Sequence, residues 1–176
     1  GEEASAYYAA GTAQYHIDAD IVYAIRKYVA MSGDTDFLSK FGAEILIETA
    51  RMWLSLGFYS ERRNGEFFIN GVTGPDEYNT VVNNNLYTNM MARENLRYAA
   101  DVMTRLNQEA PERCAAVADR TGFRLEETDD WRQAAQAMYL PYDEQLGIHL
   151  QDDSFLDKQP WDLESEPAGN FPLLLH

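Results

Sequence analysis

The chain carries, at residues 71–89, the sequence Gly-Val-Thr-Gly-Pro-Asp-Glu-Tyr-Asn-Thr-Val-Val-Asn-Asn-Asn-Leu-Tyr-Thr-Asn. Gly74 and Pro75 indicate a tight turn, because neither residue readily continues a helix or a strand. Two carboxylates, Asp76 and Glu77, follow at once, and acids on such a turn can point into a cavity. The next amides and hydroxyls offer the hydrogen bonds that sugar hydroxyls require. A polar loop before a helix N-cap explains the same residues equally well.

The pattern upstream of this stretch is helical and then changes to a hairpin. Apolar residues at helical spacing predict a helix that begins near Ile17 and is closed by Ser-Gly-Asp at 32–34. A second helix, joined to it by a short turn, should run antiparallel to it. Its apolar stripe is Leu38, Phe41, Ile45, Thr49, Met52 and Leu56. Between 58 and 72, Asn64 and Gly65 predict the turn of a β-hairpin.

Downstream, the sequence predicts three more helices and then an irregular segment. The first should run from about Asn85 to Gln108 and be buried on two faces. Its apolar residues are Tyr87, Met90, Met91, Leu96, Tyr98 and Val102. Pro111 is placed to begin the next helix, in which Cys114 should pack. Thr128, Asp129 or Asp130 can cap the last helix, which runs to Tyr139, and from Leu140 we expect a long irregular segment.

Composition excludes several classes of partner. The 176 residues carry a net charge of −15, which argues against nucleic acid and anionic membranes as partners. No apolar run approaches the roughly 20 residues that span a bilayer. The single cysteine, Cys114, excludes an internal disulfide and suits a reducing cytoplasm. Asp152, Asp153 and Asp157 lack His or Glu at ligand spacing, so we expect a solvated acidic loop and neither a metal nor another cofactor.

The sequence Gly-Pro-Asp-Glu-Tyr at 74–78 resembles the signature of glycoside hydrolase family 65, the inverting disaccharide phosphorylases and related hydrolases. Other segments also resemble this family, in the same order: Gly-Thr-Ala-Gln-Tyr-His-Ile-Asp-Ala-Asp-Ile-Val-Tyr-Ala at 11–24, Gly-Ala-Glu-Ile-Leu-Ile-Glu-Thr-Ala-Arg at 42–51, Leu-Pro-Tyr-Asp-Glu at 140–144 and Gln-Asp-Asp-Ser-Phe-Leu-Asp at 151–157. The resemblance implies a mainly α fold, an (α/α)6 barrel, with a small β-hairpin near 58–72. Periodicity alone is equally compatible with an ordinary helical bundle.

The resemblance also bears on the extent of the chain. The family's complete enzymes are several times longer, so we expect residues 1–176 to be a fragment of the catalytic domain that holds about half of the barrel. Such a fragment should be inactive alone. It should also self-associate through unpaired apolar helix faces, and we expect a homo-oligomer.

The resemblance implies cleavage of a glucose disaccharide of the kojibiose, trehalose or maltose type. Inorganic phosphate is then the co-substrate, and β-glucose 1-phosphate is the product. Glu77 becomes the general acid, and the neighbouring Asp76 either raises its pKa by its negative charge or orients the loop. The family often has an acid where this chain has Asn83, which removes one possible source of a raised pKa.

The residues before the first helix match the loop that lines the acceptor subsite in this family. Thr12, Gln14 and His16 are therefore candidates to bind acceptor hydroxyls. The alternative is that His16 and Asp18 only cap the helix. Two other functions stay open: an inverting hydrolase of the acid trehalase type, which uses water, and a non-catalytic helical interaction domain.

Overall fold

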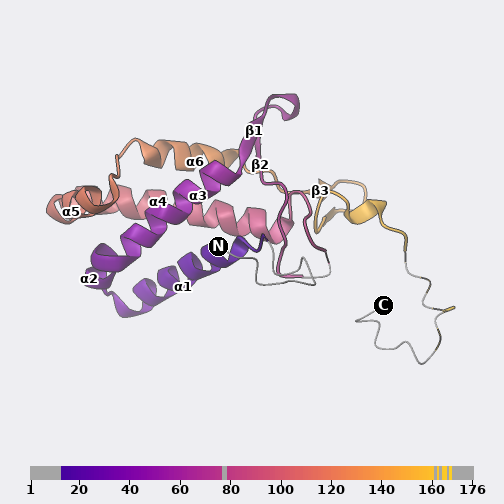
Figure 1. The fold of residues 1–176 in the computed structure, drawn as a ribbon, viewed down its shortest axis with the longest axis horizontal. Coiled ribbons are helices and arrows are strands. Elements are labelled where there is room, and N and C mark those ends of the chain that lie inside the picture. The colour runs from indigo at the N-terminus through magenta and orange to yellow at the C-terminus, as the bar shows by residue number, and fades with distance from the viewer. Residues whose placement is uncertain (1–12, 77–78, 161, 163, 166, 168–176) are drawn as a thin grey trace.

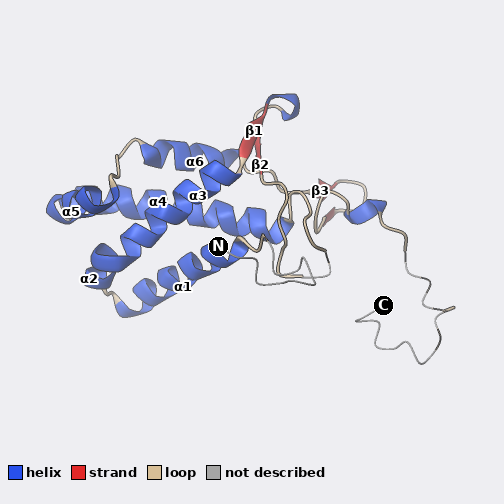
Figure 2. Ribbon diagram, viewed as in Figure 1, coloured by secondary structure: helices blue, strands red, loops and turns tan. Residues whose placement is uncertain are grey.

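The computed structural model describes residues 13–76, 79–160, 162, 164–165 and 167. Thr12 and Glu77 lie outside these residues. The helices gather at one end of the molecule, and the loops and short hairpins lie at the other (Figures 1 and 2). Among the described residues, no helix is both long enough and apolar enough to cross a membrane.

The first two long helices form the antiparallel pair that the sequence predicts. Helix α1 (His16–Ser32) ends at Gly33, whose φ of 67° is the left-handed conformation that favours glycine at a helix end. The Asp34 side chain then accepts a 2.8 Å hydrogen bond from the Phe37 amide and caps α2 (Thr35–Phe37). A π-helical segment, Leu38–Gly42, leads into α3 (Ala43–Leu56), which runs back beside α1 (Figure 1).

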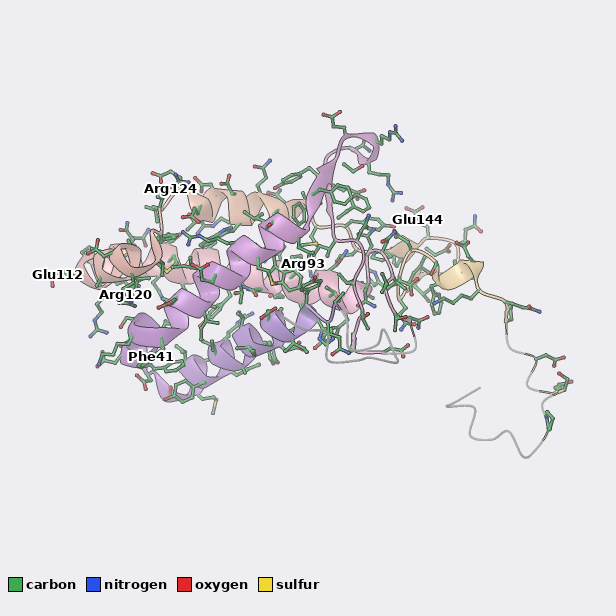
Figure 3. The ribbon with its side chains drawn as sticks, viewed as in Figure 1. Phe41, Arg93, Glu112, Arg120, Arg124 and Glu144 are labelled. Carbon is green, nitrogen blue, oxygen red and sulfur yellow. The ribbon has the colours of Figure 1, made fainter. Side chains whose placement is uncertain are left out.

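The predicted apolar stripe of this second helix is wrong for Phe41 and Ile45, whereas Met52 and Leu56 pack partly buried against the core. Phe41 is 61% exposed and Ile45 is 37% exposed, and Figure 3 shows Phe41 where α3 starts. A π-helical turn takes up more residues than an α-helical turn, so the buried face moves to different positions after Leu38. The buried face of α3 consists of Ala43, Leu46, Ile47, Ala50 and Trp53.

Helix α4 (Leu86–Glu109) is the central helix and is buried on more than one face, as predicted. It contacts α1, α3, α5 (Pro111–Thr121) and α6 (Glu127–Ala137). Tyr87 and Met90, however, are 40% and 41% exposed. Leu96 and Val102 are buried as predicted, together with Met103. Small residues and asparagines take the other core positions and allow close helix packing: Thr88, Asn89, Ala92, Asn95, Ala99 and Ala100.

The core between these helices contains two fully buried tryptophans, Trp53 and Trp131. The Trp53 indole donates a 3.0 Å hydrogen bond to Asn95 Oδ1, and Asn95 Nδ2 donates to Thr49 Oγ1 at 3.1 Å. A buried amide between α3 and α4 is tolerated because both sides of it are hydrogen-bonded. Cys114 is buried in α5 as predicted, and this burial raises the pKa of its thiol.

The predicted hairpin is present. Strands β1 (Phe58–Ser60) and β2 (Glu66–Phe68) pair antiparallel, and Asn64 and Gly65 have positive φ values of 55° and 79° in the turn. A 3₁₀ turn, Glu61–Arg63, lies between β1 and Asn64. The segment after Leu140 is less irregular than predicted, since it contains the strand pair β3 (Tyr142–Asp143) and β4 (Ile148–His149) and a 3₁₀ turn, Phe155–Asp157.

Helix α6 begins at Glu127, one residue before the first predicted cap, and none of the three predicted residues is the cap. The Thr128 hydroxyl donates to the Leu125 carbonyl at 2.8 Å instead. The Glu127 carboxylate satisfies the Arg124 amide at 2.9 Å and receives two hydrogen bonds from Arg51, at 2.7 and 2.9 Å. A partner 76 positions away in the sequence therefore determines this helix start.

Replacing Glu127 with Gln should reveal a pH-dependent contribution to stability. The hydrogen bond from Arg51 lowers the pKa of Glu127 below its ordinary value of 4.5, so the pair stabilises the fold above that pH. This contribution disappears as the pH falls through the lowered pKa. We expect E127Q to reduce the free energy of unfolding by about 2 kcal/mol near neutral pH. The loss should shrink below about pH 4.

Urea unfolding of the two proteins at both pH values measures this difference. The exposed neighbour Glu126 provides the control, because Glu126→Gln changes the same charge without an Arg51 contact. An equal loss for E127Q at both pH values would show that the ionised pair is not the cause.

Candidate active site

The predicted acceptor segment and the predicted acid loop meet where α1 and α4 begin. The Thr73 amide donates to the Ala13 carbonyl at 3.1 Å. The Tyr87 hydroxyl donates to Asp20 Oδ1 at 2.7 Å, and His16 Nδ1 lies 3.0 Å from Asp20 Oδ2. Both helices begin at the loop-rich end of the molecule (Figure 1). Two stretches far apart in the sequence, with Tyr87 and Asp20 separated by 67 positions, thus form one candidate site.

The acid loop, residues 72–82, is closed at its base by a short antiparallel bridge. Val72 and Val82 exchange backbone hydrogen bonds of 2.9 and 2.8 Å. Gly74 packs against the Asn85 side chain, so a Cβ at this position would lie 2.5 Å from Asn85 Nδ2. That amide cannot easily move, because its oxygen accepts from the Thr88 amide at 3.0 Å. The chain therefore needs glycine at the first position of the Gly-Pro turn.

Asp76 is held by amide groups on the acid loop. Its Oδ2 atom accepts from Gln151 Nε2 at 2.6 Å and from Asn79 Nδ2 at 2.9 Å. Lys158 Nζ donates in turn to Asn79 Oδ1. Hydrogen bonds from neutral amides favour the ionised carboxylate and leave its negative charge in place. Asp76 is thus a fixed acidic group directly before Glu77 in the sequence.

Asn84 connects the acid loop to three other parts of the chain. Its side chain is buried, and its Oδ1 accepts from the Ile69 amide at 3.2 Å. Its Nδ2 donates to Asp153 Oδ2 at 2.7 Å and to Asn70 Oδ1 at 3.3 Å. Asn89 Nδ2 lies 3.4 Å from the same Asn84 oxygen. This amide therefore holds the fold together and is not open to a sugar.

The other two residues of the Asn-Asn-Asn run also have structural contacts. Asn85 is the N-cap of α4, which is the alternative that the sequence left open for this polar stretch. Asn83 is exposed, and its Oδ1 accepts from the Gly71 amide at 3.1 Å. Asn83 thus stabilises the base of the loop.

Three residues of the candidate site have strained backbones. Ala13, Val81 and Asn84 have φ values of 58°, 54° and 51°, and only Asn64 shares this conformation among the described non-glycine residues. A positive φ is costly for a β-branched residue such as Val81. Strain of this kind amounts to about 1–3 kcal/mol per residue, and it concentrates at functional sites.

His16 is buried at the start of α1 and does not cap it. The N-cap residue is Tyr15, and no side-chain hydrogen bond caps this helix, which rules out the capping alternative for His16 and Asp18. Burial raises the pKa of Asp18. His16 Nε2 has no hydrogen-bond partner among the described residues. The Tyr87 ring packs edge-on against His16, and the hydrogen bond to Asp20 raises the Tyr87 pKa to about 12.

The structure describes only some of the other residues that the sequence analysis singles out. Gln14 is partly buried beside Ala13, whereas Thr12 and Glu77 lie outside the described residues. The predicted solvated acidic loop is wrong for Asp152, which is fully buried. Its Oδ1 accepts from the amide and the hydroxyl of Ser154 at 2.8 and 2.6 Å. Within the described part of the chain, no cluster of His, Cys, Asp or Glu could hold a metal ion.

Comparison of the sequence with known proteins shows the family of this chain. Residues 2–176 match the family model of the glycosyl hydrolase family 65 central catalytic domain. The chain belongs to this family. It is 52% identical, over its whole length, to an α,α-trehalose phosphorylase of Geobacillus stearothermophilus. It is 33% identical, over 93% of its length, to a kojibiose phosphorylase of Caldanaerobacter subterraneus subsp. tengcongensis. The chain spans 23% and 21% of these two relatives.

A solved structure supports the family 65 fold. It is described as "Putative kojibiose phosphorylase from human microbiome", and it matches 89% of this chain with a TM-score of 0.74 and 28% sequence identity. The chain covers 22% of that structure. The described helices are therefore part of an (α/α)6 barrel, and the bundle alternative is wrong.

Sequence reasoning missed Gln151 and Lys158, which contact the acid loop of this family 65 chain. Gln151 lies 75 positions from Asp76 and Lys158 lies 79 from Asn79, so no local pattern connects them. One signal was present for Lys158. It is the only Lys or Arg in the acidic stretch 140–176.

Proposed function

We propose that the chain is part of a longer enzyme, called the full-length enzyme below, that cleaves α,α-trehalose with inorganic phosphate. The products are β-glucose 1-phosphate and glucose. The identity of 52% and 51% to two α,α-trehalose phosphorylases, against 33% and 31% to two kojibiose phosphorylases, favours trehalose as the disaccharide. Groups that bind phosphate and the transferred glucose belong to other parts of the full-length enzyme.

The proposed chemistry needs one proton donor and one nucleophile. Glu77 gives its proton to the oxygen that links the two sugars, and the bond from this oxygen to the anomeric carbon breaks. A phosphate oxygen attacks that carbon from the opposite face, so its configuration inverts. A general acid must be protonated near neutral pH, and a fixed negative charge nearby raises its pKa. The amide-bound carboxylate of Asp76, one residue from Glu77, is the observation that carries this proposal.

Incubation of the full-length enzyme with trehalose, with and without phosphate, tests the proposed function. We expect glucose 1-phosphate to form only when phosphate is present. Release of glucose at the same rate without phosphate would identify a hydrolase. No cleavage of any α-linked diglucoside under either condition would leave the non-catalytic interaction domain.

We further propose that His16 binds the acceptor sugar through Nε2. This nitrogen is buried and has no partner within the described part of the chain, and burying an unsatisfied polar group is costly unless a ligand supplies the hydrogen bond. In the reverse reaction, His16→Ala should weaken the use of glucose as acceptor by about 1–3 kcal/mol, seen as a raised KM for glucose. The KM for β-glucose 1-phosphate should stay nearly constant.

Lys27→Ala, at an exposed position of the same helix, is the control for this variant. Gln14 and Thr12 are proposed to share the acceptor, and their Ala variants belong in the same series. If H16A raised the KM of both sugars equally, His16 would have only a structural role.

A further inference from the structure

We propose that Gln151 and Lys158 are positioning residues for the general acid. They lie in the segment 151–158, which we name the clamp, and they hold the acid loop on both sides of Glu77. This inference rests on the proposed function, since it assigns the two residues to the proton donor of that reaction.

The backbone of the clamp is fixed to the start of α4. The Gln151 carbonyl accepts from the Leu86 amide at 2.9 Å and from Asn85 Nδ2 at 3.3 Å. Two positions further on, the Asp153 amide donates to the Asn83 carbonyl at 3.2 Å, and the Asp153 side chain accepts from Asn84 at 2.7 Å. The clamp therefore lies against a rigid helix end, which makes it a firm base for side chains that reach outward.

Two side chains reach from this base to the acid loop. Gln151 Nε2 donates to Asp76 Oδ2 at 2.6 Å, directly before Glu77 in the sequence. Lys158 Nζ donates to Asn79 Oδ1, two positions after Glu77. Asn79 Nδ2 donates to the same Asp76 oxygen at 2.9 Å and completes a ring of contacts. Both sides of the loop are thus bound to one segment.

Asp152 fixes the position of Lys158. Its carboxylate is fully buried, and Lys158 Nζ lies 3.4 Å from its Oδ2. A buried carboxylate that loses a cationic partner is strongly destabilised. Lys158 is thus held at Asn79 by a charge that cannot reach water, even though its own side chain is 43% exposed.

The contacts of Gln151 with Asp76 and of Lys158 with Asn79 suit a loop that carries a proton donor. Gln151 binds Asp76 through a neutral amide, so the Asp76 charge beside Glu77 is kept. Lys158 places its own charge on the amide of Asn79 and on Asp152. The contacts with Asp76 and Asn79 thereby fix the loop on both sides of Glu77 in the sequence.

Kinetics of the full-length enzyme with two substrates test this inference. Trehalose needs a proton on its leaving oxygen, whereas an activated aryl α-glucoside leaves with little help from an acid. Gln151→Ala and Lys158→Met should each lower kcat for phosphorolysis of trehalose by about 10- to 100-fold, because a small displacement of a catalytic group is costly. The KM for trehalose should change by less than about threefold, and the rate with the aryl glucoside should also stay within about threefold.

Isosteric and conservative variants separate positioning from general stability. Gln151→Glu keeps the shape but puts a second carboxylate 2.6 Å from Asp76, so it should lose more activity on trehalose than Gln151→Ala. Lys158→Arg keeps the charge and should recover most of the activity that Lys158→Met loses. Gln133→Ala, on the exposed side of α6, is the matched control and should behave as wild type.

Two results would overturn the inference. One is a rate within about twofold of wild type on trehalose for both Gln151→Ala and Lys158→Met. The other is an equal loss on trehalose and on the aryl glucoside, which indicates damage to the fold. Glu77→Gln, measured in parallel, separates this failure from failure of the proposed function. If Glu77→Gln discriminates between the two substrates and the clamp variants do not, only the clamp is wrong; if Glu77→Gln does not discriminate, the general acid is wrong and the clamp proposal falls with it.

Discussion

Glu77→Gln in the full-length enzyme should lower kcat for trehalose by about 10² to 10⁴-fold, the usual contribution of a positioned general acid. Glutamine has the shape of glutamic acid but cannot give a proton to the leaving sugar oxygen. The loss should be much smaller with an activated aryl α-glucoside, whose leaving group is stable as an anion. Steady-state kinetics with both substrates at saturating phosphate provide the measurement.

Glu61→Gln is the control for this variant, because Glu61 lies exposed in the turn of the first hairpin. It changes the same charge away from the acid loop and should have wild-type kinetics. Turnover of trehalose by E77Q at a near wild-type rate would exclude Glu77 as the general acid, whatever its behaviour with the aryl glucoside.

Asn84→Ala should loosen the acid loop more than any other single change among the three asparagines 83–85. It removes the hydrogen bonds that Asn84 makes to Ile69, Asn70 and Asp153. It also leaves the Ile69 amide buried without an acceptor, and each such unsatisfied group costs about 1–3 kcal/mol. We expect a local loss of about 3 kcal/mol in the free energy of opening of this region.

Hydrogen exchange of the full-length enzyme, followed by mass spectrometry, measures this loss. Peptides from residues 67–90 should exchange about 100-fold faster in N84A, whereas peptides from α3 should be unchanged. Asn107→Ala, at an exposed position of α4, is the control. Uniform acceleration in all peptides would indicate global destabilisation, and unchanged exchange in 67–90 would show that Asn84 does not hold the loop.

The helices were predictable from sequence because local signals mark their ends. Gly33 closes α1, Asn85 caps α4 and Pro111 begins α5, and each acts through its own backbone geometry or through a neighbour a few positions away. The hairpin turn at Asn64 and Gly65 is local in the same sense. Such signals do not depend on the rest of the fold.

The errors arose where a distant residue or an unusual turn decides the structure. The π-helical segment after α2 moves the buried face of α3, and apolar spacing alone does not show it. The start of α6 depends on Arg51 of α3, which donates a hydrogen bond to Glu127, the first residue of α6. Likewise, Asp152 is fully buried next to Lys158, although its acidic neighbours suggest a solvated loop.

The candidate site was predictable in part. The motifs name Asp76 and His16 as candidates, whose roles stay predictions, and the structure brings their segments together through the contact of Thr73 with Ala13. The roles of Glu77 and Thr12 remain predictions. The amides next to Glu77 resembled sugar ligands, but Asn84 and Asn85 are buried by contacts that only the folded chain shows.

Proton NMR of the first product formed by the full-length enzyme from trehalose and phosphate tests the proposed reaction directly. Glu77 protonates the oxygen that links the two sugars. Phosphate that attacks the anomeric carbon from the face opposite to this oxygen must convert the α-linked glucose into the β anomer of glucose 1-phosphate. We expect β-glucose 1-phosphate, formed in equal amount to glucose, before any other anomer accumulates. Initial formation of α-glucose 1-phosphate, or of glucose alone, would contradict the inverting phosphorolysis proposed for this site.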